Sequence, residues 1–355
     1  MSLIPATILT GFLGSGKTTL LKRVLAEAHG QKIAVIENEF GEENIDSDIL
    51  VSDTNEQIIQ MSNGCICCTI REDLRNTLQM LAAKKRKGLL DFDRVVIETT
   101  GVADPGPVAQ TFFMDDEIAE SYLLDSILTL VDAKHAEQQL NDRQEARRQV
   151  GFADQIFISK TDLVSQEETV ALMHRLKHMN PRAPQKAVHF GEVALSEVFD
   201  LRGFNLNAKL DIDPDFLKDE DHDHGHGHGD HEGHDHAPGE ACDHPSHAHG
   251  GAHHRHDDDV KSFFFKSDRP FDPAKLEDFL GAIVNIYGPR MLRYKGVLYM
   301  KGTDRKVIFQ GVHQLMGSDL GPPWAEGEVR GSKMVFIGID LPKDILLQGM
   351  EQSLV

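Results

Sequence analysis

A glycine-rich loop near the start of the chain carries the residues best suited to chemistry. It reads Gly11-Phe12-Leu13-Gly14-Ser15-Gly16-Lys17-Thr18-Thr19 and fits the pattern GxxxxGK[ST] at every position. In such a loop backbone N–H groups converge on phosphate oxygens, and the following helix adds the positive end of its dipole. Lys17 is expected on the β and γ phosphates of a nucleotide, and Thr18 on Mg²⁺. The expected nucleotide contacts come from Gly11, Gly14, Ser15, Gly16, Lys17, Thr18 and Thr19.

A second motif joins an acid to a glycine, in Glu98-Thr99-Thr100-Gly101. It follows an apolar run that reads as a buried strand. At this distance behind a phosphate-binding loop, GTP-hydrolysing proteins place an acid that reaches Mg²⁺ and a glycine that senses the γ-phosphate. We therefore expect Glu98 and Lys17 to serve catalysis and Gly101 to lie beside the terminal phosphate.

A third motif, Ser159-Lys160-Thr161-Asp162, resembles the guanine-reading pattern NKxD. A carboxylate such as Asp162 can accept hydrogen bonds from N1–H and N2–H₂ of guanine, whereas adenine has an acceptor at N1 and no amine at C2. The motif therefore favours GTP over ATP, with Lys160 and Asp162 in contact with the base. Ser159 replaces the usual Asn and is shorter, so the strength of this selectivity is left open. A surface Lys-Thr-Asp turn without a ligand is the alternative.

Three cysteines cluster at Cys65, Cys67 and Cys68. Thiolates suit Zn²⁺ and similar ions, and a carboxylate from Glu37 or Glu42 could complete a tetrahedron. A redox pair is one alternative, since Cys65 and Cys68 also have CxxC spacing, and inert buried cysteines are another. Neither thioredoxin-like context nor an extracellular leader accompanies the cluster.

A histidine-rich and aspartate-rich tract lies between residues 211 and 259. Thirteen of the nineteen histidines fall between His222 and His256. The tract contains fifteen acidic residues and only two basic ones. This composition predicts disorder, and its imidazoles and carboxylates predict binding of zinc, cobalt, nickel or copper. A solvated spacer is the alternative. The expected ligands include His222, His224, His226, His228, His253, His254 and His256.

Five ordered motifs together resemble the CobW-related metal-chaperone branch of the GTPases: GFLGSGKTT, ENEFGE, NGCICC, ETTG and SKTD. The resemblance implies a GTP hydrolase that handles a transition metal, with the CxCC cysteines as its internal metal site and a smaller C-terminal domain. It leaves the metal open, because zinc, cobalt and insertion into particular enzymes occur among relatives. The expected cofactors are GTP, Mg²⁺ and Zn²⁺, with Co²⁺ or Ni²⁺ as alternatives.

The elements that must position these motifs alternate strands with helices, which indicates an α/β domain with a mainly parallel sheet. The carboxyl ends of such strands share one edge, where ligands bind. The predicted strands are 4–10, 32–36, 58–61, 94–98, 126–132, 154–159 and 186–189. We expect the phosphate-loop GTPase domain at 1–210, the disordered linker at 211–260, and the smaller α+β domain at 261–355.

The C-terminal α+β domain is predicted to contain a sheet and two helices. Its predicted elements are a strand at 262–266, a helix at 273–286, a hairpin of 291–300 and 306–312, a strand at 334–339 and a short terminal helix. It has no catalytic constellation of its own. His313 is expected to be a satisfied histidine, and Trp324 is expected to pack or to contact a partner.

The net charge of −20 argues against nucleic acid and anionic membranes as partners, and the absence of a leader or a long apolar run favours a cytosolic protein. The leading hypothesis is a metal-dependent GTPase that carries zinc to a client metalloprotein, either alone or as a homodimer. A passive histidine-rich metal buffer, a nickel or cobalt insertion GTPase and a small-molecule kinase are the alternatives.

Overall fold

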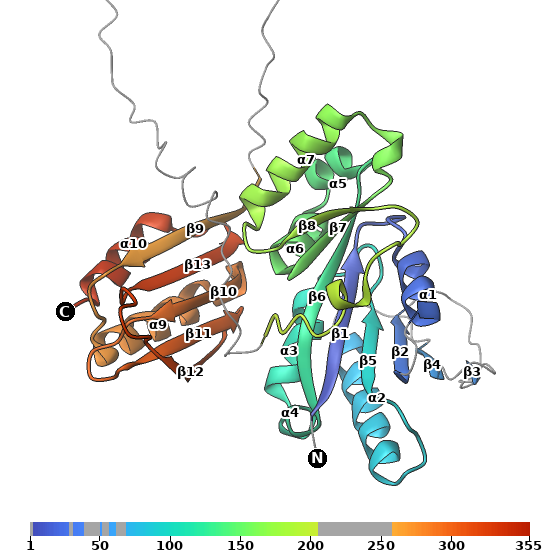
Figure 1. Cartoon of the computed structure of the whole chain (residues 1–355), viewed down its shortest axis with the longest axis horizontal. Helices are drawn as coiled ribbons and strands as arrows, with labels where there is room; N and C mark the ends of the chain where they lie inside the picture. The colour runs from blue at the N-terminus through green and yellow to red at the C-terminus, as the bar shows by residue number, and fades with distance from the viewer. Residues whose placement is uncertain (1–2, 28–30, 39–49, 52–56, 62–68, 205–257) are drawn as a thin grey trace, which may run out of the picture.

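The computed structural model describes residues 3–27, 31–38, 50–51, 57–61, 69–204 and 258–355 (Figure 1). Its larger sheet is parallel apart from β3, which pairs antiparallel with β4. In spatial order its strands are β3 (Leu50–Val51), β4 (Gln57–Met61), β2 (Ile33–Asn38), β5 (Arg94–Glu98), β1 (Ile4–Gly11), β6 (Tyr122–Asp132), β7 (Gln155–Ser159) and β8 (Gln185–Val188). The predicted α/β architecture with a mainly parallel sheet is confirmed.

Seven helices in the described residues accompany this sheet. They are α1 (Lys17–Glu27), α2 (Thr69–Arg86), α3 (Pro105–Met114), α4 (Asp116–Ser121), α5 (Ala136–Asp142), α6 (Gln144–Phe152) and α7 (Gln166–Met179). Helix α1 begins at Lys17 and buries Leu20, Leu21, Val24 and Leu25, the helical spacing that its sequence shows. None of the helices in the described part of the chain has the length and apolarity needed to cross a lipid bilayer.

Strand register brings the motifs to one edge of the sheet. Leu9 of β1 is the partner of Glu98 at the end of β5, and Gly11 is the partner of Leu130 in β6. Asp132, the last residue of β6, is in turn the partner of Ser159 at the end of β7. Because these pairings are parallel, the segments that follow the strands emerge side by side, as the sequence predicted.

The C-terminal sheet is antiparallel, in the order β12-β11-β10-β13-β9. Its strands are β9 (Val260–Ser267), β10 (Met291–Leu298), β11 (Arg305–Val312), β12 (Leu315–Pro323) and β13 (Ser332–Ile339), and its helices are α9 (Pro273–Tyr287) and α10 (Lys343–Gln352). Asp272 caps α9 through the N–H groups of Ala274 and Lys275, and Pro273 occupies its first turn. This is the predicted small α+β domain.

Alternate side chains of β9 pack into two different apolar clusters. Phe263 and Phe265 pack with the residues of α9 and α10 in one core cluster. Phe264, between them in sequence, belongs instead to a core cluster that it shares with residues of the first domain. One face of the sheet therefore packs on its own helices, and the first domain contacts the end of the sheet nearest to it (Figure 1).

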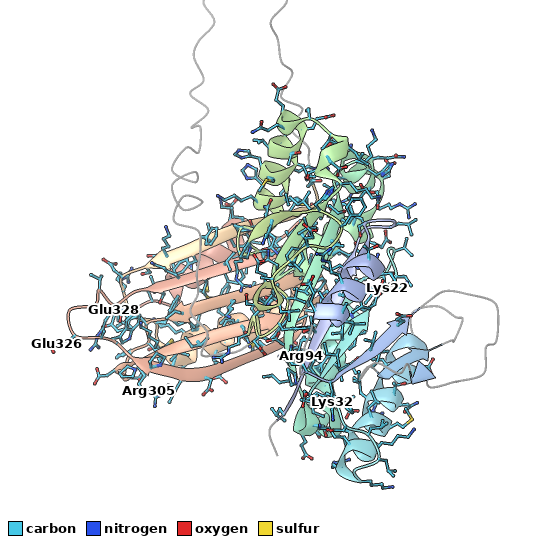
Figure 2. The ribbon with its side chains drawn as sticks, turned by 45° about the vertical axis from the view of Figure 1, so that its right-hand side comes forward. Lys22, Lys32, Arg94, Arg305, Glu326 and Glu328 are labelled. Atoms are coloured by element: carbon cyan, nitrogen blue, oxygen red, sulfur yellow. The ribbon has the colours of Figure 1, made fainter. Side chains whose placement is uncertain are left out.

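The outer end of the C-terminal sheet is polar, and Arg305, Glu326 and Glu328 lie there (Figure 2). Trp324 packs edge-on against Tyr299, with ring centroids 6.0 Å apart. The ammonium of Lys306 lies 4.9 Å from the Trp324 ring and 2.6 Å from a Glu328 carboxylate oxygen. These contacts confirm that Trp324 packs within the domain.

A buried ion pair fastens the two domains. Arg293 of β10 lies 2.6 Å from the Asp154 carboxylate, and both side chains are nearly inaccessible to solvent. Its guanidinium also donates to the carbonyls of Phe152 and Gly203, at 3.0 and 2.8 Å, and lies 4.0 Å above the Phe204 ring. Asp154 accepts the N–H of Ile127 as well. Both charges are thus satisfied within the junction.

We expect Arg293→Met to lower the free energy of unfolding by roughly 3–5 kcal/mol, because it removes the direct ion-pair partner of the buried Asp154 carboxylate. The matched control is Arg269→Met, which breaks an exposed pair with Glu351 and should cost about 0–1 kcal/mol. Urea unfolding of the two variants compares them. Equal losses would contradict a role for the buried pair at the junction.

Candidate nucleotide-binding site

Lys17 reaches back across the loop of residues 11–19. Its amine donates to the carbonyl oxygens of Gly11 and Phe12, both at 3.1 Å, and its side chain is only 8% exposed. Burial lowers the pKa of Lys17, and the negative charge of Glu98 opposes that shift. The loop therefore holds a cation in its concave side, where an anion would replace the two carbonyl contacts.

The glycines of this loop have conformations or neighbours that side chains would disturb. Gly11 has a φ of +141°, and a Cβ there would lie 2.2 Å from the carbonyl oxygen of Leu130. Gly14 and Gly16 also have positive φ, at +73° and +94°. A backbone of this kind favours glycine and leaves the N–H groups accessible to phosphate oxygens.

The acid and glycine of the second motif lie beside the loop. Thr18 Oγ1 donates to Glu98 Oε1 at 3.0 Å, which joins the start of α1 to the end of β5. A Cβ on Gly101 would lie 2.5 Å from Leu13 Cα, so the backbone of this segment touches the loop directly. Thr99 adds a hydrogen bond of 2.8 Å between its hydroxyl and that of Thr10.

The third motif is tied to the same loop. Ser159 Oγ donates to Ser15 O at 2.7 Å, which shows that the shorter residue still links the two loops. Lys160 adopts a left-handed conformation with φ +58° and donates to Gly14 O at 2.8 Å. Asp162 is half-exposed, and its carboxylate lies 3.8 Å from His189 Nδ1. Lys160 and Asp162 thus follow β7 at the edge that also carries the loop.

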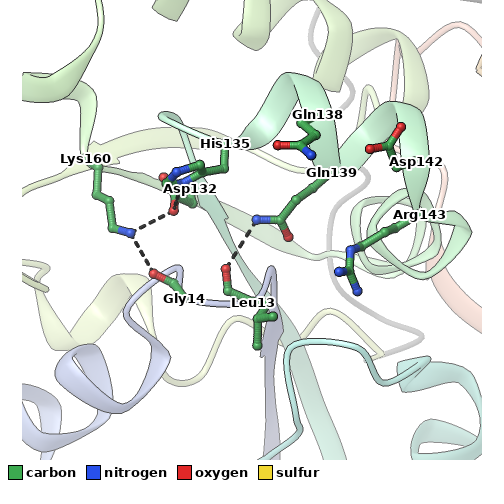
Figure 3. A pocket seen from close by; sticks show the side chains of 9 residues that line it. All are labelled: Leu13, Gly14, Asp132, His135, Gln138, Gln139, Asp142, Arg143 and Lys160. Atoms are coloured by element: carbon green, nitrogen blue, oxygen red, sulfur yellow. Dashed lines mark hydrogen bonds and ion pairs between the residues drawn. The ribbon is translucent and has the colours of Figure 1, made fainter.

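A pocket of about 560 Å³ opens between the loop and α5 (Figure 3). Its lining residues are Leu13, Gly14, Asp132, His135, Gln138, Gln139, Asp142, Arg143 and Lys160. Gln139 donates to Leu13 O at 3.2 Å, and Lys160 bridges Gly14 and Asp132, so the pocket is walled by hydrogen-bonded groups. Its size is that of a small-molecule site.

Asp132 is the principal site residue that sequence reasoning missed. It is 1% exposed and accepts hydrogen bonds from Lys160 Nζ at 2.7 Å and from Lys134 N at 2.9 Å, and it lies 2.9 Å from His135 Nδ1. Burial acts to raise the pKa of Asp132, but the hydrogen bonds from Lys160 and His135 outweigh it and hold the pKa below its usual value. Its position at the end of a predicted strand was the available signal.

The predicted metal ligands fall mostly outside the described residues. Glu42, the cysteines of the CxCC cluster and the histidine tract all lie there, and Glu37 at the end of β2 is described. Glu37 is the in-register partner of Glu98 on one side and of Gln60 on the other. Within the described ranges, no three His, Cys, Asp or Glu side chains gather as a metal-binding group.

Both domains match families of known proteins. The CobW/HypB/UreG nucleotide-binding domain matches residues 5–186, and the cobalamin synthesis protein cobW C-terminal domain matches residues 260–354. The zinc chaperone YjiA of Escherichia coli (strain K12) is 39% identical over 347 residues, 97% of this chain and 96% of that protein. The zinc-regulated GTPase metalloprotein activator 1 of Dictyostelium discoideum is 32% identical over 340 residues, 86% of this chain and 64% of that protein.

A solved crystal structure has the same fold as this chain. The crystal structure of Zn(II)-bound YjiA GTPase from E. coli has a TM-score of 0.75 and 36% identity, over 99% of both chains. In this chain a glycine-rich loop joins the buried parallel strand β1 to helix α1, and Glu98 ends the neighbouring strand β5. This arrangement defines a P-loop nucleotide-binding protein. The two family matches then identify the chain as a member of the CobW/HypB/UreG family, as the five motifs indicated.

We expect the stability of the wild-type protein to fall more steeply in acid than that of Asp132→Asn. A carboxylate with a depressed folded pKa stabilises the fold above its unfolded pKa of about 3.9, and this contribution is lost as pH falls through the folded pKa. Urea midpoints of both proteins between about pH 6 and pH 2 measure the difference, since other carboxylates affect both equally. Parallel pH profiles would show that Lys160 and His135 do not stabilise the charged form.

Proposed function

We propose that this chain is a GTP-hydrolysing zinc chaperone that couples GTP binding and hydrolysis to the capture of Zn²⁺ and its transfer to a client metalloprotein. Family membership and the names of its relatives support the proposal. The observation that carries it is the pairing of Glu37 with Glu98. Adjacent strands lie about 4.8 Å apart. The end of β2, whose Glu37 is a proposed zinc ligand, therefore lies beside the end of β5, whose Glu98 is a proposed Mg²⁺ ligand.

Thr18 and Glu98 would hold Mg²⁺. A hydroxyl and a carboxylate 3.0 Å apart are hard oxygen donors, which this ion prefers. When bound, Mg²⁺ would neutralise charge on the β and γ phosphates. Lys17 would exchange its two carbonyl contacts for the same phosphates, together with N–H groups of Gly14 and Gly16. Gly101, in backbone contact with Leu13, would lie beside the γ-phosphate.

Asp162 would bind the guanine base. Lys160 would hold the loop of residues 159–162 against the P-loop. Lys160 already bridges Gly14 and Asp132, and Ser159 holds Ser15, so a base in contact with this loop would be fixed relative to the phosphates. The pocket beside these residues has room for the nucleoside half of the nucleotide. The proposed substrate is therefore GTP rather than ATP.

The cargo would be bound by three thiolates, Cys65, Cys67 and Cys68, with a carboxylate from Glu37 or Glu42. Three thiolates leave a divalent site net negative, so a fourth ligand that comes and goes offers a route from capture to release. The tract between His222 and His256 would gather metal ions before transfer. A reducing cytosol, where thiols stay free, is the proposed location.

We expect Lys17→Ala to lower GTP hydrolysis by at least about a hundredfold, because the lysine stabilises charge on the transferred phosphate. Zinc stoichiometry, measured by elemental analysis after purification without a histidine tag, should stay unchanged, because the hydrogen bonds of this amine in the described residues go to the loop carbonyls of Gly11 and Phe12. Loss of zinc together with hydrolysis would show that the two sites are not separate.

We expect zinc affinity to differ by about 5-fold to 150-fold between the protein bound to a non-hydrolysable GTP analogue and the protein bound to GDP. Competition with a zinc-sensitive dye measures both constants, and GTP-analogue affinity must change by the same factor on zinc binding. Cys67→Ser should remove the difference. Equal zinc affinities in the two states would exclude the chaperone and leave a GTPase with a structural metal or a passive metal buffer.

A further inference from the structure

Helix α6 lies between the proposed γ-phosphate segment and the C-terminal sheet. One face of α6 contacts residues 101–104, which connect β5 to α3. Near the end of the helix, a Cβ on Gly151 would lie 2.6 Å from Leu292 Cδ1, and Phe152 packs edge-on against His313. The same short helix therefore contacts the nucleotide-binding edge and the second domain.

Gln149 is the residue of α6 that holds this segment. It is fully buried, and its Nε2 donates to Ala103 O at 2.9 Å and more weakly to Gly101 O at 3.4 Å. The backbone carbonyl of Gln149 accepts a hydrogen bond from the Thr129 hydroxyl at 2.8 Å. Its Oε1 is buried and has no hydrogen-bond partner within the part of the chain that the structure describes. A buried amide with one unsatisfied end costs stability, so packing alone does not account for it.

Two further contacts leave the segment little freedom. Arg148, next to Gln149, pairs with the Asp104 carboxylate at 2.7 Å, and Asp104 also caps α3. On the opposite side, the backbone of Gly101 touches Leu13 of the P-loop. The segment is thus held between the P-loop and α6, and Gln149 binds the carbonyl of Gly101 itself as well as that of Ala103.

We propose that Gln149 is a positioning residue for GTP hydrolysis, which fixes the backbone of Gly101 at the distance from the P-loop that the γ-phosphate requires. The inference rests on the proposed placement of the γ-phosphate beside Gly101. Gln149 would act through the segment, because its side-chain amide donates to the carbonyls of Gly101 and Ala103. It therefore supports recognition of the third phosphate and leaves binding of the first two to the P-loop.

Gln149→Met tests this role, because methionine has a similar length but cannot donate to the two carbonyls. It also removes the unpaired Oε1, which offsets part of the lost stability. Thr129→Val is the matched control, since it removes one buried hydrogen bond to the backbone of the same residue and leaves the segment contacts in place. Gln149→Asn, which keeps the amide but is one methylene shorter, serves as a second variant if the methionine variant fails to fold.

The readout is the ratio of affinity for a non-hydrolysable GTP analogue to affinity for GDP, with kcat and KM for GTP. We expect Gln149→Met to lower the ratio and kcat about tenfold, in line with the loss of buried hydrogen bonds, while GDP affinity stays unchanged. Thr129→Val should leave the ratio at the wild-type value. A purely structural role would lower thermal stability in both variants without changing the ratio, and that result would overturn the inference.

Gly101→Ala separates this inference from the proposed site. Its Cβ would clash with Leu13, so it should lower the same ratio directly. A lower ratio in Gly101→Ala and a wild-type ratio in the Gln149 variants would refute the role of Gln149 and keep the γ-phosphate site. Wild-type ratios in all of these variants would refute both.

Discussion

The parallel pairing of β1 with β5 on one side and β6 on the other is the constraint on which the site depends. It sets Leu9 beside Glu98 and Gly11 beside Leu130, so the P-loop emerges between the acid motif and the pocket wall. Because the side chains in this part of β1 are buried, a one-residue register slip would move each of them to the opposite face of the sheet and disrupt the packing on both faces. The hydrophobic core therefore fixes the positions of the groups proposed to contact phosphate.

The site motifs and most elements were predictable because their signals are local. The glycines and Lys17 specify the loop without reference to the rest of the chain, and apolar runs of strand length mark β1, β5 and β7. The shared edge followed from topology, which is general for parallel sheets. Glu98 and Lys160 could thus be placed near the loop from sequence, and the structure places them there.

Other features could not be predicted, because they depend on pairings and contacts that exist only in the folded chain. Strand β12 contains Gly, Ser, Asp and Pro, and most of its side chains are exposed, so neither propensity nor alternation marks it. Its pairing with β11 creates it. Gln149 reads as an ordinary polar residue of a helix, and only the folded chain places it on Gly101 and Ala103. Asp132 lies at a predicted strand end, yet its partners come from the turn before α5 and from Lys160, which follows β7.

The nucleotide and metal sites proposed for one edge of the sheet should respond to each other. A single-turnover experiment tests it most directly: protein loaded with Zn²⁺ is mixed with GTP, while a zinc-sensitive dye and a phosphate sensor are followed together. The account predicts that free zinc changes with the same rate constant as phosphate release. A full turnover of GTP with free zinc constant throughout would contradict it.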